Sequence, residues 1–286
     1  MALPRLALAV IGDEIGPSLP EMISFCAEHG IRRLDMRTVD GRNLLAMTLR
    51  EATAVADALK AAGLEVPTLV SPLLKWAAAD KAASNGPVDF AFDPAQCPEK
   101  DVLAHAFDLA AVLGASRIRV FSHLRYPGFA PDDLGPALDR LMDLAARHDV
   151  VVELENEPVC NLGSVGELAD FFRTYGASSS RLHPLVDIAN SYAMKAPPTE
   201  TDIAHLAPKV DTIHLKDRDF AGNRTVPLGD GDIRWADELT RLLAGVAADE
   251  IVASIETHCP HDGRNATGKS VKALRRIAAE IGAETV

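Results

Sequence analysis

Helical segments that stop at glycine or aspartate and run into β-type segments recur along this chain. Clear examples are 25–30 before 31–37, 58–63 before 64–70, and 110–114 before 117–121. A glycine placed just after a helix adopts the left-handed conformation at low steric cost, so each one marks a helix end. Asp149 ends the segment 144–148 in the same way. The pattern predicts helices that alternate with parallel strands.

The same signals predict eight strands and eight helices. Strands are expected near 6–11, 31–37, 64–71, 117–122, 150–156, 183–188, 210–216 and 250–257. Helices are expected at about 18–29, 48–62, 99–114, 131–147, 164–175, 199–206, 232–244 and 267–281. Eight alternations without a long linker indicate the α/β class, as a single (β/α)8 TIM barrel with parallel strands over residues 1–286. The alternative is a doubly wound open sheet, but no G-x-G-x-x-G follows the first predicted strand.

The composition supports a large core and narrows the classes of partner. The chain has 286 residues, is 48% apolar and carries a net charge of −12. Such an acidic surface repels phosphate backbones, so we expect no nucleic-acid partner. The sequence has no apolar run of about 18 residues that would span a bilayer, and its four cysteines form no C-x-x-C pair. We expect a cytoplasmic protein with a small-molecule substrate and no membrane partner, and a homo-oligomer is an open alternative.

Four potential metal ligands each end a β-type run in the second half of the chain. They are Glu155, Asp187, His214 and Glu256, which are separated by 32, 27 and 42 residues. The carboxyl ends of parallel barrel strands meet at one face, so these side chains should converge there. An ion pair explains any one of them alone, but three converging carboxylates repel one another without a cation. We therefore expect one divalent cation, and this donor set suits Mn²⁺ (manganese), Mg²⁺, Co²⁺ or Zn²⁺.

Five motifs in the C-terminal half resemble those of the xylose-isomerase-like TIM-barrel superfamily, the sugar phosphate isomerase/epimerase family. They are Glu155-Asn-Glu-Pro158, Asp187-Ile-Ala-Asn190, His214-Leu-Lys-Asp217, Gly229-Asp-Gly-Asp-Ile-Arg-Trp235 and Ile255-Glu-Thr257. The resemblance implies that the four ligands hold one divalent cation and that Glu155 and Glu256 are the catalytic acid and base. Two such carboxylates can remove an α-proton and return it, and the cation stabilises the enediolate between these steps.

Other polar residues are expected at the same barrel mouth. Lys216 is a candidate for holding a substrate oxygen, although a rim salt bridge is the alternative. Asp217 is a candidate acceptor for the imidazole of His214, and Asp232 is expected to cap the next helix. The residues expected to bind substrate are Arg37, Trp76, His123, Glu157, Asn190 and Lys216. For Arg37 and His123, a structural hydrogen bond is the alternative.

The segment 73–98 is the longest expected irregular stretch. It contains several prolines and glycines, and it follows the third predicted strand on the presumed active face. Loops of this length are often lids, so we expect it to close over the substrate. Trp76 within it can stack on a sugar ring, and packing on the barrel rim is the alternative.

Departures from the family patterns narrow the range of reactions that we expect. Asn190 stands where the DNA-repair endonuclease branch has histidine, which favours one metal over three, and Asn161 and Phe220 replace the Glu and Arg typical of ketose 3-epimerases. We expect a metal-dependent isomerase or epimerase of a sugar or polyhydroxy ketone that works through an enediolate. The alternative is a lyase or dehydratase that eliminates a β-substituent from an oxo-sugar, an oxo-glycoside or a dehydroshikimate-like acid. A DNA-repair endonuclease and a non-catalytic binding subunit are further rivals.

Overall fold

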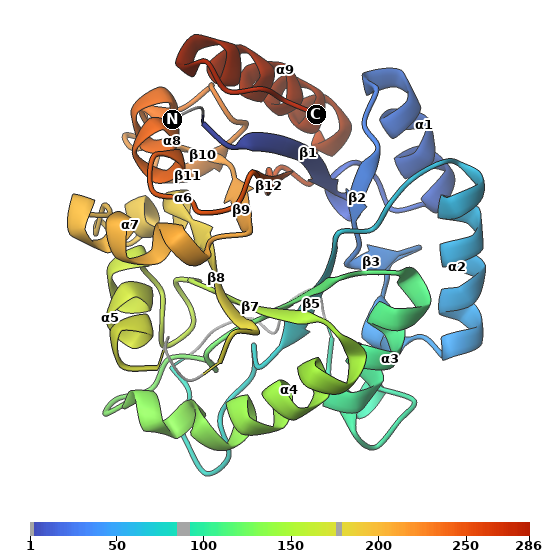
Figure 1. The fold of residues 1–286 in the computed structure, drawn as a ribbon. Coiled ribbons are helices and arrows are strands. Elements are labelled where there is room, and N and C mark those ends of the chain that lie inside the picture. The colour runs from blue at the N-terminus through green and yellow to red at the C-terminus, as the bar shows by residue number, and fades with distance from the viewer. Residues whose placement is uncertain (1–2, 85–91, 176–178) are drawn as a thin grey trace.

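Eight parallel strands form a nearly closed barrel with helices around its outside (Figure 1). The structure is a computed structural model that describes residues 3–84, 92–175 and 179–286. The strands lie in the order β2-β1-β12-β9-β8-β7-β6-β5. Their bounds are β1 (Arg5–Ile11), β2 (Arg33–Asp35), β5 (Thr68–Leu73), β6 (Arg117–Val120), β7 (Val151–Glu155), β8 (Leu182–Asp187), β9 (Thr212–Leu215) and β12 (Glu250–Ile255). The predicted TIM barrel and all eight of its strands are confirmed.

The barrel closes between β2 and β5 through isolated bridges, Arg33 to Glu65 and Met36 to Leu69, without a regular ladder. A buried carboxylate supports this junction. Asp35 accepts a hydrogen bond from the Thr68 backbone N–H (2.9 Å) and another from the Ser254 hydroxyl (2.6 Å). Burial raises the pKa of Asp35, and these hydrogen bonds oppose the rise. One side chain therefore connects β2, β5 and β12 inside the barrel.

Helices follow the strands as the glycine pattern predicts. They are α1 (Leu19–His29), α2 (Leu49–Ala61), α3 (Val102–Leu113), α4 (Gly135–His148), α5 (Val165–Tyr175), α7 (Glu200–Leu206), α8 (Trp235–Leu243) and α9 (Gly263–Ile281). Gly30, Gly114 and Asp149 end α1, α3 and α4 in the left-handed conformation, with φ of 63°, 71° and 55°. Every helix in the described part of the chain is too short or too polar to span a bilayer.

Two short hairpins and one short helix at the carboxyl ends of the strands were not predicted. The hairpin β3 (Thr38–Val39) with β4 (Arg42–Asn43) follows β2, helix α6 (Ile188–Ala193) follows β8, and the hairpin β10 (Asp217–Asp219) with β11 (Arg224–Val226) follows β9. The expectation that Asp232 caps a helix is wrong. Its carboxylate accepts from the backbone N–H of Phe220 (2.7 Å), and Arg234 holds the N-cap position of α8.

The predicted lid lies partly outside the described residues, because residues 85–91 of the segment 73–98 fall there. In the described part, Trp76 is partly buried and packs against the hydrophobic core. Its backbone oxygen accepts a hydrogen bond from the Leu124 N–H (3.0 Å). Closure of the segment over a substrate, and stacking of Trp76 on a sugar ring, stay predictions.

Candidate metal centre

The four predicted ligands converge at the carboxyl end of the barrel. Glu155 ends β7, Asp187 ends β8, His214 lies in β9 and Glu256 directly follows β12. One potential ligand atom from each lies within 4.8 Å of the others, and all four side chains are buried. Parallel strands place their carboxyl ends at a common face, which is why residues so far apart in sequence meet.

His214 faces two of the carboxylates through one ring nitrogen. Its Nδ1 lies 3.0 Å from Glu155 Oε1 and 3.7 Å from Glu256 Oε2. Burial lowers the pKa of His214, but the two carboxylates outweigh burial and raise the pKa to about 10. In turn, burial raises the pKa of Glu155, and the nearby His214 and Arg119 overcome this and bring the pKa to about 2. The site therefore strongly favours a positive charge beside these oxygens.

Lys216 contacts the other side of the cluster. Its ammonium lies 2.5 Å from Asp187 Oδ2 and 2.8 Å from Glu256 Oε2, and the side chain is buried. Burial lowers the pKa of Lys216, but the surrounding carboxylates overcome burial and raise it above its usual value. The lysine that the sequence places near substrate thus bridges two of the predicted ligands.

Arg119 is a site residue that the sequence reasoning missed. Its Nη1 lies 3.1 Å from Glu155 Oε2 and 3.8 Å from Glu256 Oε1, and its guanidinium covers the Phe121 ring at 4.5 Å. The sequence did contain a signal for this residue. Arg119 lies in a predicted barrel strand, and alternate residues of a strand share a face, so Arg117, Arg119 and Phe121 face the same side. A charged side chain facing a barrel interior requires a partner.

Arg37 binds three carboxylates, two of which were also missed. Its Nε contacts both oxygens of Asp13 (2.9 and 3.0 Å), its Nη2 donates to Glu14 (2.8 Å) and its Nη1 donates to Glu256 (3.2 Å). Asp13 and Glu14 lie in a single 3₁₀ turn, Gly12–Glu14, directly after β1. Arg37 therefore connects the first two strand ends to the last one.

The charges of this connected network fit a divalent cation. Five carboxylates, those of Asp13, Glu14, Glu155, Asp187 and Glu256, share three permanent cations, Arg37, Arg119 and Lys216. With neutral imidazoles, as metal coordination requires, the network carries a net charge of −2. Three carboxylates and one imidazole are also donors that Mn²⁺ or Zn²⁺ accepts. Glu155, Asp187, His214 and Glu256 are the residues that would hold it.

A second group, Glu14, Glu256 and His258, is also close enough to hold an ion. Both Glu14 oxygens already have donors: Oε1 accepts from Arg37, and Oε2 accepts from the Thr257 hydroxyl (2.9 Å) and the His258 N–H (2.8 Å). His258 Nε2 lies 3.2 Å from Glu256 Oε1. This group is explained as a hydrogen-bonded support for Glu256.

A cavity of about 570 Å³ opens beside the cluster. Its lining includes Arg37, Lys75, Arg119, Glu157, Glu256 and His258. Lys75 Nζ pairs with Glu157 (3.2 Å) and lies 4.8 Å from the centre of the Phe121 ring. Two of the predicted substrate-binding residues, Arg37 and Glu157, thus line the cavity that reaches Glu256. We call it the mouth cavity.

The remaining predicted residues have structural partners. Asn190 donates its backbone N–H to Asp187 Oδ1 (2.9 Å) and its side chain to the Asn156 carbonyl (2.8 Å), which fixes the Asp187 carboxylate. His123 has a φ of 58°, and its Nδ1 lies 3.2 Å from the Trp76 carbonyl. Contacts of Asn190 and His123 with substrate stay predictions.

The expectation that Asp217 accepts from the imidazole of His214 is wrong. Its carboxylate accepts from the backbone N–H groups of Arg218 (2.8 Å), Gly229 (3.0 Å) and Ile233 (3.2 Å). Gly231 packs directly against this carboxylate, and a side-chain carbon at that position would collide with it. Asp217 therefore organises the loop at the end of β9.

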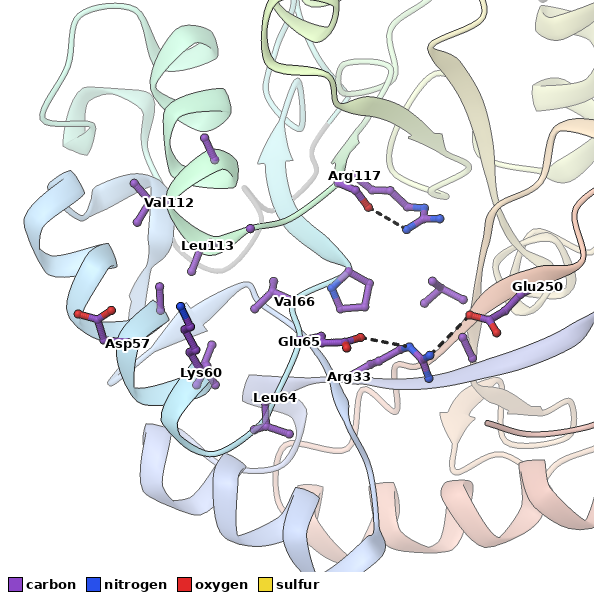
Figure 2. Close-up of a pocket in the computed structure, with 18 of the residues that line it drawn as sticks. Arg33, Asp57, Lys60, Leu64, Glu65, Val66, Val112, Leu113, Arg117 and Glu250 are labelled. Carbon is purple, nitrogen blue, oxygen red and sulfur yellow. Dashed lines mark hydrogen bonds and ion pairs between the residues drawn. The ribbon is translucent and has the colours of Figure 1, made fainter.

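A cavity of about 630 Å³ lies at the opposite end of the barrel, at the amino ends of the strands (Figure 2). Arg33 lies between Glu65 (3.8 Å) and Glu250 (3.5 Å), as the dashed lines in Figure 2 show. Both groups of potential ligands found among the described residues lie at the other end. The amino-end cavity is the larger of the two, but it lacks a converging donor set in the described part of the chain.

Comparisons with known proteins agree with the fold. A family model described as the xylose isomerase-like TIM barrel matches residues 23–277. A search among curated proteins found no match.

Solved structures cover nearly the whole chain at low identity. The IOLI protein with a bound zinc atom is 14% identical over 96% of this chain and 99% of its own, with a TM-score of 0.69. D-allulose 3-epimerase from Methylomonas sp. is 17% identical over 97% and 100%, with a TM-score of 0.67. The 3-keto-D-glucoside 4-epimerase from E. coli is 15% identical over 96% and 100%, with a TM-score of 0.65.

Proposed function

The chain belongs to the xylose isomerase-like TIM barrel family, and on that premise we propose that it is a divalent-metal-dependent isomerase or epimerase. Its proposed substrate is a sugar or a related polyhydroxy ketone. Neighbouring structures with the same fold include an allulose epimerase, a keto-glucoside epimerase and a zinc-binding protein. The observation that carries the proposal is the buried set of Glu155, Asp187, His214 and Glu256, whose ligand atoms lie within 4.8 Å of one another.

Glu155 and Glu256 are the proposed acid and base. They come from β7 and from the end of β12, and both contact the same His214 nitrogen. One carboxylate would remove the proton next to the substrate carbonyl, and the other would return a proton to the resulting enediolate. A bound divalent cation would supply Lewis-acid polarisation of the carbonyl.

Other residues of the mouth cavity would orient the substrate. Lys75 and Glu157 form an ion pair at the cavity wall and offer both a donor and an acceptor for hydroxyl groups. Arg37 holds one oxygen of Glu256 and thereby fixes the direction in which this carboxylate faces the cavity. A base must lie within hydrogen-bond reach of the proton that it removes, so such positioning contributes directly to rate.

The test is a panel of ketoses, oxo-glycosides and oxo-acids incubated with metal-loaded protein in D₂O. We expect one divalent cation per chain and an isomeric product in which deuterium replaces one carbon-bound hydrogen of the substrate. Isomerisation without deuterium uptake would contradict return of the proton by a second carboxylate that exchanges its proton with solvent. Loss of water or of an aglycone would instead identify the elimination chemistry of a lyase, and two or three cations per chain would favour the nuclease alternative.

A further inference from the structure

Lys216 contacts the same oxygens that a cation held by the four ligands would use. Asp187 Oδ1 accepts the backbone N–H of Asn190 (2.9 Å), which leaves Oδ2 as the oxygen open to a cation, and Lys216 Nζ lies 2.5 Å from Oδ2. The Lys216 ammonium therefore occupies the same Asp187 oxygen, Oδ2, that a bound cation would use.

Glu256 shows the same division between its two oxygens. Oε1 faces Arg37 (3.2 Å) and His258 (3.2 Å), whereas Oε2 faces Lys216 (2.8 Å) and His214 (3.7 Å). The oxygen on the His214 side is the one that a cation shared with His214 would bind, and Lys216 donates to it. The Lys216 side chain is 2% exposed, so water screens little of its charge.

We propose that Lys216 competes with the divalent cation for Asp187 and Glu256, so that loading the site moves the ammonium off these carboxylates toward the substrate. Two positive charges on the same oxygens repel at short range, and burial strengthens that repulsion. Glu157, which lines the mouth cavity, is a further carboxylate that acts on Lys216 and attracts it toward the cavity.

The consequence is a lysine that lowers metal affinity and becomes a substrate donor once the metal is bound. This inference rests on the proposed function for the identity of the site and the cation. Lys216 then has different partners before and after loading, and a site without it would bind metal more tightly but hold substrate less well.

The test compares Mn²⁺ binding to wild type, Lys216→Met and Lys75→Met by calorimetry after treatment with a chelator. Lys75 is the matched control, because its ammonium lies at the cavity wall and its carboxylate partner there is Glu157. We expect Lys216→Met to tighten the Kd by about 10-fold or more, and Lys75→Met to change it by less than about 3-fold. Equal or weaker Mn²⁺ binding by folded Lys216→Met would overturn the inference.

A second measurement does not depend on the folding of the variant. In a crystal structure of the wild type loaded with Mn²⁺, we expect Lys216 Nζ beyond hydrogen-bond distance, about 3.5 Å, from Asp187 Oδ2 and Glu256 Oε2. Both contacts retained beside a bound ion would overturn the inference while leaving the proposed function intact. If Lys216→Met binds Mn²⁺ and wild type does not, the competition is supported and metal dependence of the natural enzyme fails. If neither binds, both proposals fail.

Discussion

The two ends of the barrel carry charged cavities of similar size, about 570 and 630 Å³, that are built in different ways. At the carboxyl end, Arg119 and Glu155 are almost fully buried, with side chains 2% and 1% exposed. At the amino end, Arg33 is 21% exposed and its partners Glu65 and Glu250 are 74% and 32% exposed. Buried charges shared among several partners distinguish the candidate site from the other cavity, whereas cavity volume does not.

The difference has a physical basis in solvation. A buried ion pair has already lost its water, so removing one partner leaves a charge that nothing compensates. An exposed pair exchanges its partner for water at little cost. We therefore expect the buried Arg119–Glu155 pair at the carboxyl end to respond strongly to single substitutions and the Arg33 pairs at the amino end to respond weakly.

The largest expected effect is on stability, from Arg119→Met. The substitution leaves the buried Glu155 with His214 as its remaining charged partner, and we expect the free energy of unfolding to fall by about 3 kcal/mol. The matched control is Arg33→Met, for which we expect a loss of about 1 kcal/mol or less. Urea denaturation in the presence of EDTA measures both without compensation by a metal. Equal losses of unfolding free energy in the two variants would contradict the expected difference between the buried pair at the carboxyl end and the exposed pairs at the amino end.

The next effect is on turnover. Glu155→Gln and Glu256→Gln preserve shape but remove the proton-carrying carboxylate, so each should lose on the order of 10²-fold or more in kcat. Glu250→Gln at the amino end is the control and should keep kcat within about 2-fold, because it lies away from the ligand cluster. Steady-state kinetics measures kcat for each variant, and the metal content of each variant is measured in parallel. Near-normal kcat in a metal-bound variant would exclude that glutamate from the acid and base pair.

The smallest effect is a pH dependence at the amino end. His183 Nδ1 lies 2.7 Å from Asp211 Oδ2. Burial lowers the pKa of His183, but the hydrogen bond and charge of Asp211 prevail and the pKa is raised above 6.5. Because the folded pKa is the higher one, the stabilisation is fully present below the unfolded pKa and disappears as pH rises through the folded pKa.

His183→Asn should therefore cost about 1 kcal/mol or less of unfolding free energy at about pH 5.5, and less than that at about pH 9. Urea denaturation of wild type and variant at both pH values measures the change. Asp211→Asn should reproduce the same pH dependence, since it removes the other partner. A cost that does not vary with pH would show that the ion pair contributes nothing.

The parts of the molecule that were predictable depend on local sequence. Strands and helices follow from apolar periodicity and from residues such as Gly30 and Gly114, whose left-handed conformation ends a helix. The convergence of Glu155, Asp187, His214 and Glu256 was predictable because a strand end is itself a local feature. Local signals therefore located the elements and the four side chains that converge at their ends.

The missed residue Arg119 and the missed pairings of Arg37 depend on contacts across the closed barrel. Arg119 pairs with a residue 36 positions away and Arg37 with one 219 positions away, so neither partner is visible locally. The hairpin β10–β11 was also missed, and the Asp217 carboxylate at its start accepts hydrogen bonds from Gly229 and Ile233 in the loop that follows. Side-chain pairings that form only when the barrel closes cannot be predicted from the residues at the strand ends.

The Asp217 carboxylate has a consequence for anyone who redesigns this protein. It ties the start of β10 to the loop that precedes α8, and Gly231 leaves room for it. Residues 217–233 therefore form one transferable part. A graft that exchanges the hairpin but keeps the old loop would remove Asp217 and leave the backbone N–H groups of Gly229 and Ile233 without this acceptor, whereas a graft of the whole segment keeps these hydrogen bonds.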